Sequence, residues 1–175
     1  MTLDSMKYSL WLSPKGEAGR ALQALIDELA ERYNAPKFLP HITLVAHLNL
    51  NDEELADTKA SMQKLAADQM PFSITLNDYG FMNEQHRALY LLADSNELAE
   101  LYQRAVAHFP QIEDERFQNM PHLSVLYGQH DSEIKRQIIA THSLGPIQFE
   151  VDSLDLCLSE GPESDWHIVH STPLG

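Results

Sequence analysis

One short motif occurs twice in the chain, and this repetition constrains the fold more than any other feature. Residues 40–45 (PHITLV) match residues 121–126 (PHLSVL) in residue class at every position. Each copy follows a predicted helix and a proline-containing loop, and each opens an apolar strand. The repeat is far too long for a solenoid. We therefore predict two related halves whose equivalent strands meet about a pseudo-two-fold axis.

Strands and helices are predicted to alternate along the whole chain. Periodicity of apolar residues predicts strands at about 7–13, 41–48, 72–81, 87–92, 122–127, 147–158 and 166–171, and helices at about 16–34, 51–68 and 132–141, with another beginning near 94. No Gly-rich or Ser-rich spacer separates these segments. We therefore expect residues 1–175 to form a single domain of two intertwined lobes.

The composition is typical of a globular protein. Hydrophobic residues make up 43% of the chain and charged residues 22%. No apolar run approaches the roughly 20 residues that cross a bilayer, and Met1–Lys7 lacks the pattern of a secretory signal. Cys157 is the single cysteine, so no internal disulfide can form, and we expect it to be a small buried hydrophobe. These features predict a cytoplasmic monomer without a membrane partner.

The charge balance argues against a general nucleic-acid-binding protein. The chain has 12 Lys and Arg residues against 26 Asp and Glu residues, for a formal net charge of −14. Binding along a polyanion requires clustered basic residues. This charge balance still allows the protein to bind a small phosphate ester through a few hydrogen-bond donors. The acidity has a second interpretation, since it also favours solubility.

Each motif places an imidazole and a hydroxyl on the same face of its strand. Side chains two residues apart in a strand share a face, so His41 and Thr43 project together, as do His122 and Ser124. A neutral imidazole can take a proton from attacking water while a protonated one gives a proton to the leaving oxygen. The two hydroxyls can hold the phosphate oxygens. This set suits hydrolysis of a phosphodiester and requires neither a metal nor a cofactor.

The sequence lacks the patterns of the common metal and nucleotide sites. There is no H-E-x-x-H motif, no paired cysteine, no P-loop and no G-x-S-x-G elbow. Four other histidines lie in polar or terminal contexts, and we expect them to be solvated: His86, His108, His130 and His142. No metal site is predicted.

The two motifs resemble the signature of the 2H phosphoesterase superfamily. Segments 9–14 (SLWLSP) and 121–128 (PHLSVLYG) resemble its cyclic phosphodiesterase branch more closely. The resemblance implies a bilobal α+β fold in which two antiparallel sheets with flanking helices surround a central groove. It also implies hydrolysis of ADP-ribose 1″,2″-cyclic phosphate to ADP-ribose 1″-phosphate, and of nucleoside 2′,3′-cyclic phosphates to 2′-phosphates. In that analogy His122 activates water and His41 protonates the leaving oxygen, an assignment that the residues alone leave open.

Two aromatic residues and one loop are secondary candidates. Tyr127 stands five residues after His122, which nominally places it on the opposite face of the strand, although strand ends often bulge. The resemblance implies a nucleotide contact for this tyrosine, and Trp11 could stack on a base. Core packing is the alternative for both. The acidic stretch Gln111–Asn119 is either a lid beside His122 or a plain surface loop.

Two other functions compete with a cyclic phosphodiesterase of small nucleotides. The first is the RNA-end-processing branch of the same superfamily, against which the acidic balance argues. The second is a module that binds a phosphorylated ligand without turnover. Binding alone would not need a matched pair of imidazoles, so the intact motifs favour an enzyme.

Overall fold

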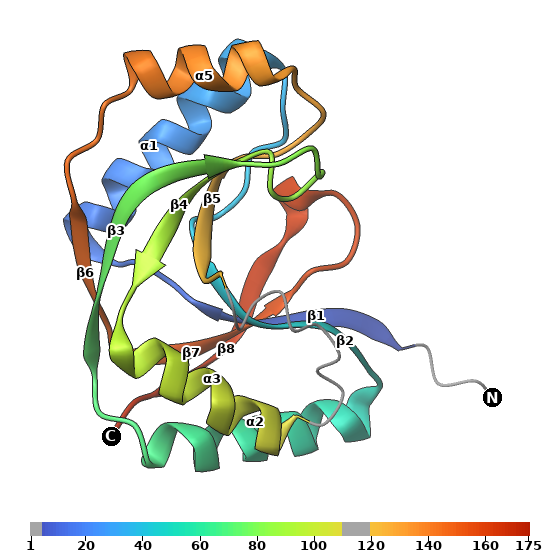
Figure 1. Cartoon of the computed structure of the whole chain (residues 1–175). Coiled ribbons are helices and arrows are strands. Elements are labelled where there is room, and N and C mark those ends of the chain that lie inside the picture. The colour runs from blue at the N-terminus through green and yellow to red at the C-terminus, as the bar shows by residue number, and fades with distance from the viewer. Residues whose placement is uncertain (1–4, 110–119) are drawn as a thin grey trace.

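The computed structural model describes residues 5–109 and 120–175 (Figure 1). Its strands are β1 (Met6–Leu12), β2 (Ile42–Leu50), β3 (Phe72–Phe81), β4 (Leu89–Asp94), β5 (His122–Leu126), β6 (Ile147–Val151), β7 (Ser153–Leu158) and β8 (His167–Pro173). Its helices are α1 (Gly16–Tyr33), α2 (Asp52–Ala67), α3 (Asn96–His108) and α5 (Ser132–Thr141), with a 3-10 turn at Glu163–Asp165. The predicted α+β class is confirmed. No helix in the described ranges is long and apolar enough to span a bilayer.

The eight strands form one curled antiparallel sheet in the order β6-β3-β4-β5-β2-β1-β7-β8. The two sheets that the resemblance implied are therefore the halves of a continuous sheet. They join between β2 and β5, where Ile42 pairs with Leu123. These two residues hold the same position in the two motifs. The pseudo-two-fold axis thus passes between the two motif strands, which meet as the repeat predicted.

Helices α1 and α3 each pack on the half of the sheet that does not contain the strand before them. Helix α1 follows β1 along the chain, but it packs on β5 and β6, while α5 packs on β3. Helix α3 lies between β4 and β5 in sequence and packs on β2, beside α2, which covers β7 and β8. Figure 1 shows α1 with α5 at one end of the molecule and α2 with α3 at the other. This exchange links the two halves.

One predicted strand is two strands in the structure. The stretch 147–158 was predicted as a single element, but it is divided at Asp152 into β6 and β7. Strand β6 pairs with β3 in one half of the sheet, and β7 pairs with β1 in the other. Apolar residues alternate at 147, 149 and 151 before Asp152 and at 154, 156 and 158 after it, so the alternation changes phase where the chain changes its partner. The prediction of a single strand overlooked this shift.

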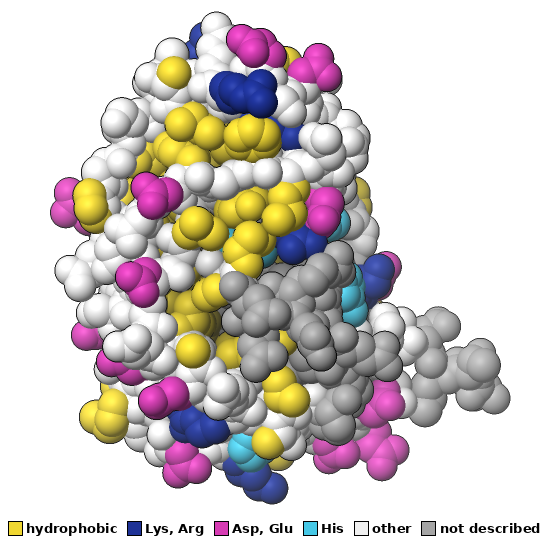
Figure 2. Space-filling view, in the orientation of Figure 1, with side chains coloured by type: hydrophobic (Ala, Val, Ile, Leu, Met, Phe, Trp, Pro, Cys, Tyr) yellow, Lys and Arg dark blue, Asp and Glu magenta, His cyan; other side chains and the backbone are white. Residues whose placement is uncertain are grey.

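The core lies between the sheet and the helices, and most charged side chains lie outside it, with Lys135 and Asp155 among the buried exceptions. Leu10, Ile26, Leu44, Leu123 and Leu156 are among its fully buried residues. Cys157 is also fully buried, as predicted. Figure 2 shows acidic side chains scattered over the visible face rather than gathered in one patch.

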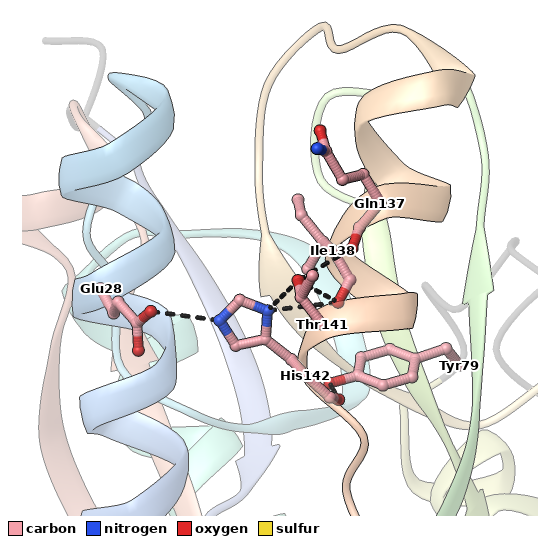
Figure 3. Close-up of polar contacts among 6 residues, drawn as sticks. All are labelled: Glu28, Tyr79, Gln137, Ile138, Thr141 and His142. Atoms are coloured by element: carbon pink, nitrogen blue, oxygen red, sulfur yellow. Dashed lines mark hydrogen bonds and ion pairs between the residues drawn. The ribbon is translucent and has the colours of Figure 1, made fainter.

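A polar cluster fastens α5 to α1 at one end of the molecule (Figure 3). His142, which ends α5, lies 3.1 Å through Nε2 from Oε1 of Glu28 on α1. Tyr79 of β3 donates its hydroxyl to the carbonyl oxygen of His142 at 2.9 Å. The expectation that His142 is solvated is therefore wrong. Its ring joins a helix of one half of the chain to a helix of the other.

Candidate active site

The two motif histidines are oriented in the same way. Nδ1 of His41 lies 2.7 Å from the carbonyl oxygen of Leu39, and Nδ1 of His122 lies 3.0 Å from that of Met120. Each carbonyl belongs to the residue two positions upstream. Because a carbonyl oxygen only accepts, Nδ1 must carry the proton in both rings. Proton exchange with a substrate is therefore assigned to Nε2 of each imidazole.

His41 is enclosed by aromatic rings. The indole of Trp11 stacks on it at 3.6 Å between centroids and 9° between planes, and Phe38 meets it edge-on at 6.5 Å. Burial lowers the pKa of His41 to about 4, although its bond to Leu39 opposes the shift. The imidazole is accordingly neutral at pH 7 in the free protein.

His122 has a similar but less enclosed setting. The ring of Tyr90 lies 5.1 Å away, tilted by 57°. Burial lowers the pKa of His122, and the charge of Arg87 lowers it further, while the bond to Met120 opposes the shift. Trp11 pairs with Thr43 across β1 and β2, as Tyr90 pairs with Ser124 across β4 and β5. The two aromatic residues are therefore pseudo-symmetric partners of the two motifs.

The two motif hydroxyls differ in their partners. Ser124 is buried and donates to the carbonyl oxygen of His86 at 2.8 Å. Thr43 is half-buried, and its hydroxyl has no hydrogen-bond partner among residues 5–109 and 120–175. In the free protein, Thr43 is thus the hydroxyl ready to donate to a ligand.

A bulge in each motif strand brings further residues to the site. The pairing of β1 with β2 skips Leu44, and the pairing of β4 with β5 skips Val125, which is the equivalent residue. An extra residue reverses the alternation of faces beyond it. Ala46 and Tyr127, each five residues after a motif histidine, therefore line the same cavity as the histidines. Strict alternation along the strand placed Tyr127 on the wrong face, because the extra residue at Val125 reverses the alternation before Tyr127.

All six predicted site residues line one cavity of about 420 Å³ between the two halves of the sheet. They are Trp11, His41, Thr43, His122, Ser124 and Tyr127. Trp11 and Tyr127 are only 1% and 3% exposed, so each is both a core residue and part of the wall. Tyr127 stacks on Phe38 at 3.7 Å, and burial raises the pKa of its hydroxyl. Their contact with a nucleotide stays a prediction.

Comparisons with known proteins identify the family. The model of the 2′-5′ RNA ligase superfamily matches residues 14–163. The chain belongs to this superfamily, that of the 2H phosphoesterases. A cyclic phosphodiesterase from Arabidopsis thaliana is 25% identical to it over 160 residues, which cover 87% of this chain and 85% of that protein.

Solved structures agree with the fold of this 2H phosphoesterase. TT0787 of Thermus thermophilus superposes with a TM-score of 0.69 at 18% identity, over 97% of this chain and 98% of that one. The apo form of Escherichia coli LigT gives a TM-score of 0.67 at 13% identity, over 98% of both chains. The predicted resemblance and bilobal fold are thereby confirmed.

Sequence reasoning missed the residues that complete the cavity wall of this phosphoesterase. The turn between β3 and β4 contributes Glu84, His86 and Arg87, and the segment before β8 contributes Glu163 and Trp166. They come from polar turns, where the sequence carries no periodic pattern. Only the scarcity of tryptophan, with two in the chain, could have drawn attention to Trp166.

His86 is exposed, as expected, but it also forms part of the cavity wall. Its Nε2 lies 3.0 Å from Oε1 of Glu163, and its ring is 4.9 Å from that of Tyr127 and 5.5 Å from that of Trp166. Burial would raise the pKa of Glu163, but hydrogen bonds that include the one with His86 lower it overall. This pair joins the wall of one half of the sheet to the wall of the other.

Two further expectations concern metals and the loop before His122. Within the described ranges, no group of three or more His, Cys, Asp or Glu side chains is arranged to hold a metal ion. The candidate lid, Gln111–Asn119, lies outside the described residues.

Proposed function

We propose that this 2H phosphoesterase is a metal-independent cyclic phosphodiesterase of small nucleotides. The observation that carries the proposal is the pair His41 and His122, which line one cavity and are each fixed at Nδ1 by a backbone carbonyl. The substrates are ADP-ribose 1″,2″-cyclic phosphate and nucleoside 2′,3′-cyclic phosphates. The relative from Arabidopsis thaliana, described as a cyclic phosphodiesterase, supports this class.

In the proposed reaction one histidine accepts a proton from water and the other donates a proton to the leaving oxygen. Nε2 of His122 takes a proton from water as the water oxygen bonds to phosphorus. The bond from phosphorus to the 3′ oxygen breaks, and Nε2 of protonated His41 gives that oxygen a proton. The product is a 2′-phosphate, and proton exchange with solvent resets both imidazoles. Thr43 donates to a non-bridging oxygen, whose charge persists through the transition state.

Substrate binding supplies the charge that the acid requires. Both imidazoles have lowered pKa values in the free protein, because burial disfavours the imidazolium. A bound phosphodiester brings a negative charge next to the rings, which favours the protonated form. The acid is therefore protonated mainly in the complex.

The test is hydrolysis of a substrate panel by purified protein in excess EDTA. We expect turnover of 2′,3′-cyclic AMP and of ADP-ribose 1″,2″-cyclic phosphate. His41→Asn and His122→Asn each retain an amide N–H in place of Nδ1 and remove Nε2, so kcat should fall by about 10²–10⁴-fold. Full activity in either variant would exclude the two-histidine mechanism.

The same panel separates the two competing functions. A strong preference for an oligonucleotide ending in a 2′,3′-cyclic phosphate would place the protein in the RNA-end-processing class. Binding of the cyclic nucleotides without turnover would identify a non-catalytic module. The net charge of −14 and the paired imidazoles favour the small-nucleotide enzyme over both.

A further inference from the structure

A lysine outside the cavity holds the turn that forms one of its walls. Lys135 lies on the inner side of α5 with 0% exposure. Its Nζ donates to the carbonyl oxygen of Met82 at 2.7 Å and to Oδ1 of Asn83 at 3.0 Å, and it lies 5.6 Å from the centroid of the Phe81 ring. Both acceptors are uncharged groups at the start of the β3–β4 turn.

A buried ammonium is an unusual choice at this position. Burial lowers the pKa of Lys135, while the Asp131 carboxylate opposes the shift. Burying the charged ammonium therefore lowers the stability of the folded protein. An apolar residue of similar length would fill the same space. It would leave the Met82 carbonyl and the Asn83 amide without their donor, however. What the ammonium adds is the attachment of the turn to α5.

The turn that Lys135 holds is attached to the active site on its other side. Residues 82–87 close on themselves through Met82 N–H to the Arg87 carbonyl at 3.1 Å and Arg87 N–H to the Glu84 carbonyl at 3.2 Å. The carbonyl of Gln85 accepts from Gly128 N–H at 2.8 Å, just beyond β5. Together with the bond from Ser124 to His86, these contacts fix the turn against the second motif strand.

We propose that Lys135 is a positioning residue for the phosphodiesterase reaction. It acts through the turn 82–87, whose residues Glu84, Gln85, His86 and Arg87 line the cavity. Without the ammonium the turn loses its attachment to α5 and is held by its contacts with β5 and by the contact of His86 with Glu163. The cavity wall and the carbonyl of His86 that accepts from Ser124 then shift together. The imidazoles of His41 and His122 are held by other carbonyls and keep their places. Loss of Lys135 therefore weakens substrate binding more than it slows the chemical step. The inference rests on the proposed function.

The test compares Lys135→Met with the matched control Arg136→Met. Arg136 is the next residue on α5, also lies near the Phe81 ring, and is largely exposed. In Lys135→Met we expect KM for 2′,3′-cyclic AMP to rise about tenfold, with kcat within about threefold and an unchanged pH profile. Hydrogen exchange at the Arg87 amide should accelerate as well. Arg136→Met should change none of these quantities.

A milder variant covers the case in which Lys135→Met does not fold. Asn83→Ala removes one acceptor at an exposed position outside the cavity lining and should produce the same two changes to a smaller degree. In the double variant the two effects should be less than additive.

Two results would overturn the inference. The first is an unchanged KM and an unchanged Arg87 exchange rate in Asn83→Ala or in folded Lys135→Met. The second is faster exchange with an unchanged KM, which would leave Lys135 a purely structural role. A wild-type protein that hydrolyses none of the substrates would instead refute the proposed function. The exchange data would then still show whether Lys135 holds the turn 82–87.

Discussion

His41 and its surroundings couple catalysis to stability. The imidazole lies between Trp11 and Phe38, and only 7% of the residue is exposed. Its Nδ1–H donates a hydrogen bond to the carbonyl oxygen of Leu39. Such a ring is held firmly, which serves proton transfer, but its charged form is poorly solvated. The surroundings of His41 therefore disfavour its protonation in the folded state, which makes the folded protein less stable in acid.

The free energy of unfolding should fall in acid because of His41. Its pKa is about 4 when folded and about 6.5 when unfolded, so below pH 6.5 the unfolded state takes up the proton first. The stabilisation is present above pH 6.5 and is lost as the pH falls toward 4, by up to about 3 kcal/mol. Urea unfolding at intervals from pH 7.5 to 4 measures this loss.

His41→Asn is the control for this loss, since it keeps a donor for the Leu39 carbonyl but does not titrate. The variant should show a shallower decline between pH 6.5 and 4. An equal decline in the variant and the wild type would assign the acid sensitivity to other groups.

The pH dependence of the rate should differ between free enzyme and complex. The profile of kcat/KM reports the free enzyme, in which burial lowers the pKa of both His41 and His122. The profile of kcat reports the complex, in which the phosphate raises these values. We expect two bell-shaped curves, with the optimum of kcat/KM at a more acidic pH than that of kcat. A rate that rises steadily from pH 5 to 9 would contradict the mechanism.

At the scale of elements, the end of β5 connects the second motif to the cavity wall. Strand β5 ends at Leu126, Tyr127 joins the wall, and Gly128 follows with φ of 109°. Few residues other than glycine adopt this conformation. A Cβ at Gly128 would also meet Nε2 of His130 at 2.9 Å. The glycine therefore sets both the direction of the chain and the bond from its N–H to Gln85.

Substitution of this glycine should impair both stability and binding. We expect Gly128→Ala to lower the free energy of unfolding by about 1–3 kcal/mol and to raise KM, because the strained backbone displaces the turn bonded to it. Gly145→Ala is the matched control, since nothing lies within 4 Å of the place that its added methyl group would take and its φ is not positive. Denaturation curves and steady-state kinetics of the two variants give the comparison. Equal stability and equal KM would show that the turn does not depend on Gly128.

At the scale of the whole molecule, the net charge opposes the approach of an anionic substrate. The formal charge is −14, while the described residues that line the cavity include two cations, Lys7 and Arg87, and two carboxylates, Glu84 and Glu163. The cavity wall therefore does little to offset the repulsion at long range. At 0.15 M salt the Debye length is about 8 Å, so salt screens that repulsion but not contacts inside the cavity.

Added salt should therefore assist substrate capture. Raising the ionic strength from about 20 to 150 mM should increase kcat/KM for a cyclic nucleotide by about two- to fivefold, with little change in kcat. Stopped assays at constant pH measure both constants. A decrease in kcat/KM would mean that Lys7 and Arg87 dominate the attraction.

The sequence by itself determined the repeated motif strands, the alternation of strands and helices, and the four motif side chains. These follow from local rules, since side-chain direction in a strand depends only on parity and apolar spacing depends only on the period. His41 with Thr43 and His122 with Ser124 could therefore be placed on shared faces without a structure. Helix 132–141 and strand 72–81 have the predicted bounds for the same reason.

Only the tertiary structure decided what lies around those side chains. The bulges at Leu44 and Val125 depend on pairing with neighbouring strands, and they reversed the expected face of Tyr127. The wall formed by Glu84, His86 and Trp166, like the anchoring of its turn by Lys135, depends on contacts between segments distant in sequence. Such contacts leave no periodic trace in the chain, because each depends on the packing of elements rather than on the spacing of residues within one element.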